Sequence, residues 1–97
     1  MVKFKWDGNK AQANLKKHGV SFDEAATVFD DPFARVIADP DHSIEEERFV
    51  ILGMSIRARE LVVCHCLRGE GNLVVRIISV RRATKKEAKQ YWRFIDA

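Results

Sequence analysis

Cysteine is scarce in this sequence, and long runs of apolar residues are absent. The two cysteines, Cys64 and Cys66, are separated by a single residue, and that spacing on one strand suits an unstrained disulfide poorly. We therefore expect two reduced thiols in a cytoplasmic protein. No apolar stretch approaches the roughly 18 residues that a membrane span needs, and residues 1–9 lack the apolar core of a secretion signal. The sequence thus predicts no contact with a membrane.

Motifs for several kinds of catalysis are also absent. There is no glycine-rich phosphate-binding loop and no serine nucleophile motif. Zinc sites usually combine two pairs of ligands, whereas Cys64 and Cys66 form a single pair. Five carboxylates fall in one expected loop: Asp39, Asp41, Glu45, Glu46 and Glu47. Magnesium sites rarely take so many ligands from one loop, so we interpret this segment as solvated and expect neither a metal nor a cofactor.

Charge is distributed unevenly along the chain. The 97 residues are enough for one domain, residues 1–97, with a modest core. Residues 1–56 contain seven Lys/Arg and ten Asp/Glu, whereas residues 57–97 contain ten Lys/Arg and four Asp/Glu. A basic C-terminal half is typical of a protein that binds a polyanion with that half.

Apolar periodicity predicts the order β-α-α-β-β-β-β-α. The first strand carries outward lysines and is expected at a sheet edge. The expected strands cover residues 2–6, 33–38, 48–54, 60–67 and 73–80, and the expected helices cover residues 8–18, 22–29 and 85–95. Short connections between the later strands favour an antiparallel meander. Helices segregated from such a sheet give an α+β fold.

Capping residues mark the helix boundaries. Asp7 can cap the first helix, and Gly19 is suited to end it. Residues 21–24 (Ser-Phe-Asp-Glu) have the pattern of a capping box, in which serine and glutamate each bind the other's backbone amide. Residues 84–87 (Thr-Lys-Lys-Glu) repeat that pattern at the start of the C-terminal helix.

The segment whose residues are best suited to binding and catalysis is the junction between the last strand and the last helix. Arg81 and Arg82 lie there, where helix amides favour an anion and guanidinium groups can bind two phosphate oxygens at once. The other cations expected to bind the phosphates of a nucleic acid are Arg57, Arg59, Arg76, Lys85, Lys86 and Lys89. The alternative is a solvated basic helix start with no ligand.

Strand alternation separates the two arginines of this junction. Strict alternation places Ile77, Ser79 and Arg81 on one face of the strand, and Arg76 and Arg82 with Val80 on the other. Only one of the two arginines can therefore be central to a reaction on one face. The pattern does not determine which face is covered.

Histidines offer a further possibility. His65 falls mid-strand and could act as acid or base when a ribose 2′-hydroxyl attacks the adjacent phosphate. The alternative is a half-buried, hydrogen-bonded histidine. His18 is interpreted as a residue of a helix C-terminal turn and His42 as an exposed turn residue.

Several stretches, in order along almost the whole chain, resemble the BrnT family of toxins. They are Phe4-Lys5-Trp6-Asp7, Asn14-Leu15-Lys16-Lys17-His18-Gly19-Val20-Ser21-Phe22-Asp23-Glu24-Ala25, Asp39-Pro40-Asp41-His42-Ser43, Leu52-Gly53-Met54-Ser55, Leu61-Val62-Val63-Cys64-His65 and Arg76-Ile77-Ile78-Ser79-Val80-Arg81-Arg82-Ala83-Thr84. The sequence departs from the family at Cys66, where the family commonly has threonine, and at residues 68–72, where this chain has a longer loop than the tighter turn of the family.

This resemblance implies a RelE-like fold and a metal-independent ribonuclease of a type II toxin–antitoxin module that inhibits translation. It also implies a hetero-oligomer with a BrnA-like, DNA-binding antitoxin. In RelE-like toxins, basic residues on the sheet and a C-terminal tyrosine tend to serve cleavage. Arg81, Arg82 and Tyr91 fall in comparable places here.

Two other functions are compatible with the residues alone. A non-catalytic nucleic-acid-binding module would share the basic half, but its binding would depend on salt and no cleavage would follow. A partner-binding subunit would use an exposed Trp6 and the N-terminal helices as its interface.

Overall fold

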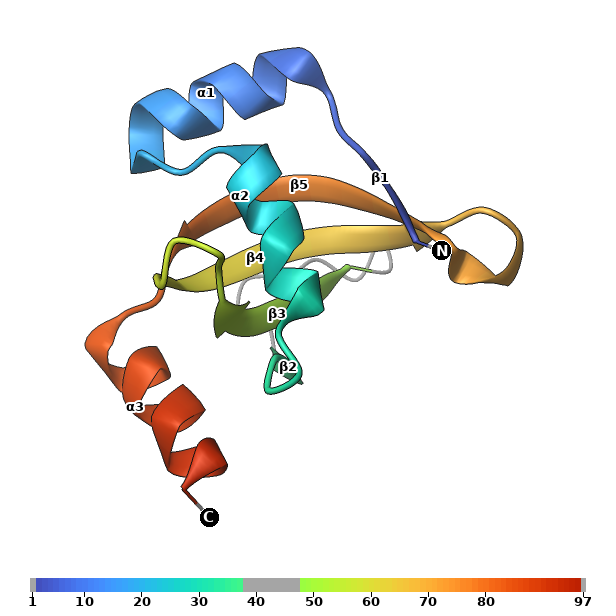
Figure 1. Cartoon of the computed structure of the whole chain (residues 1–97). Coiled ribbons are helices and arrows are strands. Elements are labelled where there is room, and N and C mark those ends of the chain that lie inside the picture. Colours follow the sequence, from blue (N-terminus) through green and yellow to red (C-terminus); the bar gives the residue numbers. More distant parts are fainter. Residues whose placement is uncertain (1, 38–47, 97) are drawn as a thin grey trace.

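The computed structural model describes residues 2–37 and 48–96 and confirms the predicted order of elements (Figure 1). The elements are β1 (Lys3–Lys5), α1 (Gly8–His18), α2 (Phe22–Thr27), the 3-10 turn η1 (Val28–Asp30), β2 (Arg35–Ile37), β3 (Phe49–Met54), β4 (Glu60–Arg68), the 3-10 turn η2 (Glu70–Asn72), β5 (Val74–Arg82) and α3 (Lys85–Ile95). The expected turn around Pro40 and the acidic cluster before Arg48 lie outside the described residues.

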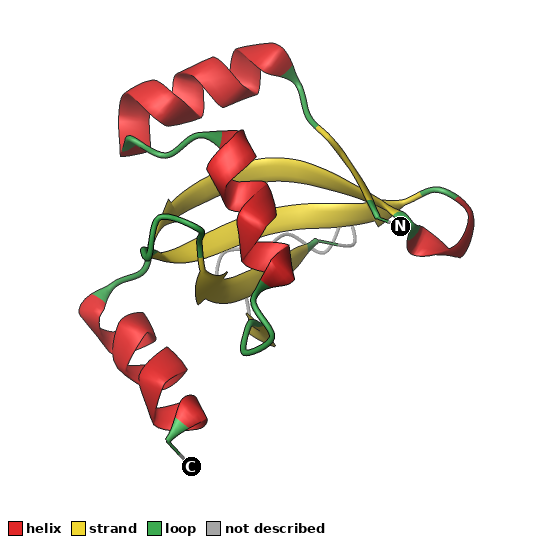
Figure 2. Ribbon diagram, in the orientation of Figure 1, coloured by secondary structure: helices red, strands yellow, loops and turns green. Residues whose placement is uncertain are grey.

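The five strands form one sheet in the order β1-β5-β4-β3-β2 (Figure 2). Strands β2 to β5 are antiparallel neighbours, which confirms the predicted meander. The lysine-bearing strand β1 is at an edge, as predicted, and it pairs parallel to β5. Consequently the first and last strands of the chain lie side by side.

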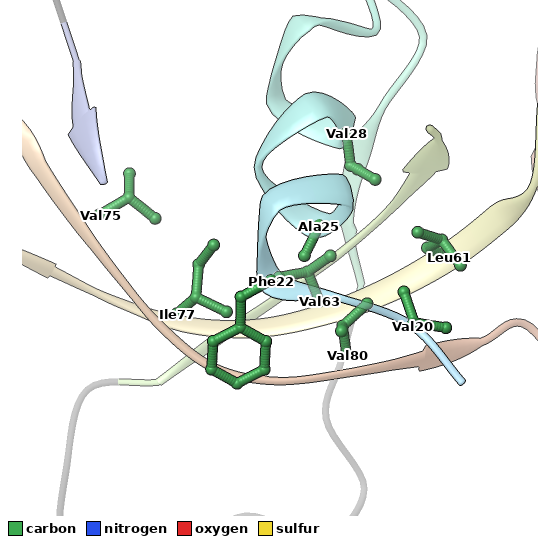
Figure 3. Close-up of a cluster of buried hydrophobic side chains, with 9 residues drawn as sticks. All are labelled: Val20, Phe22, Ala25, Val28, Leu61, Val63, Val75, Ile77 and Val80. Atoms are coloured by element: carbon green, nitrogen blue, oxygen red, sulfur yellow. The ribbon is translucent and has the colours of Figure 1, made fainter. Parts of the chain in front are cut away.

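Helices α1 and α2 cover one face of the sheet, which we call the α1–α2 face (Figure 1). The buried side chains beneath them come from α2, η1, β4, β5 and the segment before α2 (Figure 3): Val20, Phe22, Ala25, Val28, Leu61, Val63, Val75, Ile77 and Val80. Apolar burial of this kind is the main source of stability in a chain of this size. This cluster therefore fixes which side of β4 and β5 is closed to a ligand.

A buried amide attaches α1 to the sheet. The Nδ2 of Asn14 donates to the carbonyl oxygens of Val20 (3.1 Å) and Val80 (2.9 Å). Its Oδ1 accepts a hydrogen bond from the Val80 amide at 3.0 Å. Because all three contacts satisfy polar groups that would otherwise be buried unpaired, they hold α1 at one position along β5.

Helix α3 packs on the opposite face, which we call the α3 face. Tyr91 and Ile95 of α3 meet a second apolar cluster on the sheet, formed by Val50, Leu52 and Val62. The helix thus lies against β3 and the start of β4, at the end of the sheet where β5 leads into it (Figure 1). None of the helices in the described part is long and apolar enough to cross a membrane.

A β-bulge in β5 changes the alternation that strict strand geometry predicts. Cys64 pairs with Ser79, but the next residue, His65, pairs with Ile77, so Ile78 has no residue opposite it. The prediction that Ile77 and Ser79 share a face is therefore wrong. Ile77 belongs with the buried residues of the α1–α2 face, whereas Ser79 follows Cys64 onto the α3 face.

Candidate active site

Arg81 lies on the α3 face, one residue before the end of β5, opposite Val62. Its Nη1 and Nη2 donate to the two carboxylate oxygens of Glu87, at 2.7 and 3.0 Å. Nη1 also donates to the carbonyl oxygen of Arg82 at 3.3 Å. Two parallel bonds to one carboxylate fix the plane of a guanidinium group as well as its position. Arg81 is thus held in one orientation at the β5–α3 junction.

Glu87 connects this arginine to the start of α3. The Thr84 amide donates to Glu87 Oε1 at 2.9 Å, and the Glu87 amide donates to Thr84 Oγ1 at 3.1 Å, which confirms the predicted capping box. The Arg81 guanidinium, together with the Thr84 amide, lowers the pKa of Glu87 to about 2. The carboxylate is therefore ionised at neutral pH. Its part in holding Arg81 was not predicted, because the capping pattern already explained a glutamate at this position.

Arg82 lies on the other side of the sheet from Arg81. It is exposed and pairs with Leu61, a buried residue of the α1–α2 face. The two arginines therefore lie on opposite faces of the sheet, as predicted. Arg81 shares its face with Ser79 and with Arg76, which is exposed opposite Cys66. The prediction that Arg76 shares a face with Arg82 is therefore wrong, because the bulge at Ile78 shifts the alternation.

His65 lies in the core of the α1–α2 face and is only 4% exposed. The Phe29 ring meets its ring edge-on, with centroids 4.8 Å apart, and the Phe49 ring lies at 6.0 Å. Its Nδ1 is 3.3 Å from the carbonyl oxygen of Val63. Burial lowers the pKa of His65, so its ring is neutral at pH 7. The alternative of a buried histidine fits this position, and the sheet separates the ring from Arg81.

Tyr91 is also buried, at 3% exposure. Its hydroxyl donates to Asp31 Oδ2 at 2.7 Å, and the Met54 amide donates to the same oxygen at 2.8 Å. Burial and the neighbouring Asp31 raise the pKa of Tyr91 above its usual value. This geometry gives the tyrosine a structural part, the attachment of α3 to the end of β3, and argues against contact between its hydroxyl and RNA.

Arg59 forms a largely buried ion pair with Glu24, whereas the sequence had suggested an exposed cation that binds a ligand. Its Nε donates to Glu24 Oε2 at 2.9 Å, and its Nη2 forms an ion pair with Oε1 of the same carboxylate. Ser55 Oγ donates to Glu24 Oε2 at 2.6 Å. Glu24 is 5% exposed, and the Arg59 guanidinium lowers its pKa.

This ion pair corrects the predicted capping box at the start of α2. Ser21 Oγ accepts the Glu24 amide at 3.0 Å, as predicted. The Glu24 side chain, however, turns towards Arg59 and Ser55 instead of the Ser21 amide. A charged donor binds a carboxylate more strongly than a backbone amide does, which accounts for the difference.

The remaining predicted cations are exposed. Arg57 lies in the turn between β3 and β4, beside Ala58, whose φ is 60°. Lys85 begins α3, and the helix continues with Lys86 and Lys89. Those last two line a hollow of about 260 Å³ on the helix, together with Gln90 and Arg93.

The structure also bears on the possible metal ligands, the two cysteines and Trp6. Between residues 2 and 37 and between 48 and 96, no three His, Cys, Asp or Glu side chains are grouped as metal ligands would be. Cys64 and Cys66 are thiols, as predicted. Trp6 is half-buried, with its ring edge-on to Phe22 at 5.9 Å, so it is not the exposed residue that a partner-binding subunit required.

Comparison with known proteins identifies the family. The family model described as the ribonuclease toxin BrnT of type II toxin–antitoxin systems matches residues 6–87. A solved structure with this fold is the ribonuclease toxin BrnT of Brucella abortus, with a TM-score of 0.66, 23% sequence identity, and coverage of 88% of this chain and 100% of that one. No curated protein matches the sequence. The α+β class is confirmed, and the chain belongs to the BrnT family of ribonuclease toxins of type II toxin–antitoxin systems.

Proposed function

We propose that this protein is a single RelE-like domain that cleaves RNA in the cytoplasm without a metal ion and thereby inhibits translation. Family membership supports a ribonuclease. The observation that carries the finer proposal is the orientation of Arg81, which two hydrogen bonds to Glu87 fix at the β5–α3 junction.

The chemistry requires a fixed positive charge at this junction. The ribose 2′-hydroxyl gives its proton to water as its oxygen attacks the neighbouring phosphorus, and negative charge builds on the phosphate oxygens. The bond from phosphorus to the 5′-oxygen then breaks, and the 5′-oxygen takes a proton from water. A guanidinium that is already oriented stabilises this charge without having to reorganise during the reaction. The positive charge that metal-dependent nucleases take from a cation is supplied here by Arg81.

Exposed cations on β5, on α3 and in the β3–β4 turn hold the RNA in place. Arg76 lies on the same face, and Lys85 lies at the amino end of α3, where backbone amides favour an anion. Lys86 and Lys89 extend the positive surface along the helix, and Arg57 adds a charge at the β3–β4 turn. In this proposal Arg59, His65 and Tyr91 maintain the fold instead of contacting RNA.

The first prediction is that purified protein cleaves RNA in excess EDTA as fast as it does with magnesium, because side chains supply the positive charge. The cut ends should carry a 2′,3′-cyclic phosphate and a 5′-hydroxyl, which ligation and phosphatase treatment distinguish. A magnesium-dependent nuclease in the same buffer confirms chelation. Activity that disappears with EDTA and returns with magnesium would contradict the metal-independent mechanism. Binding with a steep salt dependence but no cut ends would instead support the non-catalytic module.

The second prediction concerns the antitoxin, which we propose to be BrnA-like because this family acts in type II modules. The basic residues that hold RNA are also the obvious target for carboxylates of a partner. We therefore expect antitoxin and RNA to compete, and induced expression to leave cellular RNA intact when the antitoxin is co-expressed. Native mass spectrometry of toxin, antitoxin and uncleavable 2′-O-methyl RNA should show two binary complexes. A stable ternary complex would show that the two surfaces do not overlap.

A further inference from the structure

Two lysines of β1 lie on the same face of the sheet as Arg81, at the opposite end of β5, although the charge pattern had suggested only the C-terminal half. Lys3 and Lys5 are both exposed. Between them, Phe4 turns to the α1–α2 face, where its ring is 5.3 Å from that of Phe29. Because successive side chains of a strand alternate, the two lysines lie on the α3 face.

The register of the sheet places these lysines in line with the arginines. Lys5 is paired with Arg76 in the parallel β1–β5 ladder, and the Lys3 amide donates to the Leu73 carbonyl at 2.9 Å. Arg76 pairs with Cys66 of β4, and Arg81 pairs with Val62. Because Val62 and Cys66 are an even number of residues apart on β4, the two arginines lie on the same face of the sheet. Four cations thus lie on the α3 face of two neighbouring strands.

The charges of the two β1 lysines are available to a ligand. Within the described residues, neither Lys3 nor Lys5 forms an ion pair. The nearby Asp7 carboxylate accepts the backbone amides of Asn9 (2.8 Å) and Lys10 (3.3 Å) as the cap of α1. Those amides are the main cause of its lowered pKa, and the charges of Lys10 and Arg76 add to the effect. Asp7 therefore offsets part of the positive charge near Arg76 but does not bind either β1 lysine.

We infer that Lys3, Lys5 and Arg76 form a second binding site, for the phosphates of single-stranded RNA at a distance from the cut. The inference rests on the proposed function of Arg81. Arg76 and Arg81 lie opposite Cys66 and Val62, which are four residues apart on β4, so about 13 Å of strand separates the two arginines. Alternate strand residues such as Lys3 and Lys5 are about 7 Å apart, a spacing comparable to that of successive phosphates in an extended strand. A substrate of two nucleotides reaches Arg81 alone, whereas one of twelve reaches both sites.

The test compares two double variants that remove the same charge. Lys3→Ala/Lys5→Ala changes the β1 site, and Lys16→Ala/Lys17→Ala removes two exposed lysines from the last turn of α1. The probe is a twelve-nucleotide 2′-O-methyl RNA, which lacks the nucleophilic hydroxyl, and its binding is followed by fluorescence anisotropy from 50 to 300 mM salt. We expect the β1 variant to bind roughly tenfold more weakly and its salt slope to fall by about 1.4, because each lost phosphate contact on a single strand removes about 0.7. The α1 variant should keep the wild-type slope.

Cleavage assays give a second readout. With a twelve-nucleotide RNA the β1 variant should raise KM and leave kcat unchanged, and with a dinucleotide it should match the wild type. Equal weakening of both double variants, or an equal effect on long and short substrates, would overturn the inference, because total charge and not position would then matter. A protein that cleaves no RNA refutes the proposed function, whereas the binding slopes still decide whether the β1 site exists. Thermal melting and the Lys3→Gln/Lys5→Gln variant establish that weaker binding does not come from unfolding.

Discussion

Replacing Arg81 by alanine is expected to slow RNA cleavage by about 10²–10³-fold, the usual cost of losing one donor that stabilises developing charge. The expectation follows from a guanidinium that Glu87 holds in one plane at the end of β5. Single-turnover cleavage of a defined RNA measures the rate, and growth arrest after induction measures toxicity. The variant should remain folded and should still bind the antitoxin. Cleavage at the wild-type rate would show that the β5–α3 junction is only a well-capped helix start and takes no part in catalysis.

Arg82→Ala is the matched control because it removes the same charge one residue away. Arg82 pairs with Leu61 and lies on the α1–α2 face, so it does not reach a phosphate bound at Arg81. We expect its cleavage rate to stay within about threefold of the wild type, since a surface charge of this kind contributes little. A large loss in both variants would show that the net charge of the junction matters more than the face.

A second comparison separates catalysis from the anchoring of α3. Glu87→Gln keeps an acceptor for the Thr84 amide but removes the charge that orients Arg81. If Arg81 only anchored the helix through Glu87, the Arg81→Ala and Glu87→Gln variants would lose equal stability and equal activity. The proposal instead predicts similar melting temperatures and a much larger loss of cleavage in Arg81→Ala.

Local patterns predicted the elements of this fold, because helix caps and apolar periodicity depend on neighbouring residues. Asp7, Gly19 and Thr84 occupy the cap positions that the sequence indicated. The strand after the second helix begins at Arg35, two residues later than predicted, whereas the last strand continues as far as Arg82. Such errors at element ends are ordinary, since strand ends depend on the partner strand.

Features that depend on distant residues were not predictable in the same way. The bulge at Ile78 inverts the alternation of β5, and only the pairing with β4 reveals it. Placing Lys5 beside Arg76 requires the parallel pairing of the first and last strands. His65 shares its strand parity with Leu61 and Val63, but the sequence did not show which face the helices cover. The sequence therefore predicted a set of candidate cations, and the strand register showed which of them lie on the same face as Arg81.

Arg59→Ala is expected to have the largest effect on stability, lowering the free energy of unfolding by about 3 kcal/mol. The substitution leaves the Glu24 carboxylate buried without its charged partner, with Ser55 Oγ as a remaining donor. For a domain of this size the melting temperature should fall by on the order of 10–20 °C. Urea unfolding at pH 7 measures the loss. Arg57→Ala, an exposed arginine in the same turn, is the matched control and should change stability by less than about 0.5 kcal/mol.

The pH dependence of this loss distinguishes the ion pair from simple packing. The pKa of Glu24 is lowered in the folded protein, mainly by Arg59, so its stabilising contribution is present above the unfolded value of 4.5 and is lost as pH falls through the folded value. In Arg59→Ala the buried carboxylate has lost that partner, and protonation relieves its cost instead. The difference in unfolding free energy between wild type and variant should therefore be largest near pH 7 and should shrink towards pH 3. Urea titrations at several pH values test this, and a difference that stays constant from pH 7 to pH 3 would mean that Arg59 stabilises the β3–β4 turn through its aliphatic chain and not through its charge.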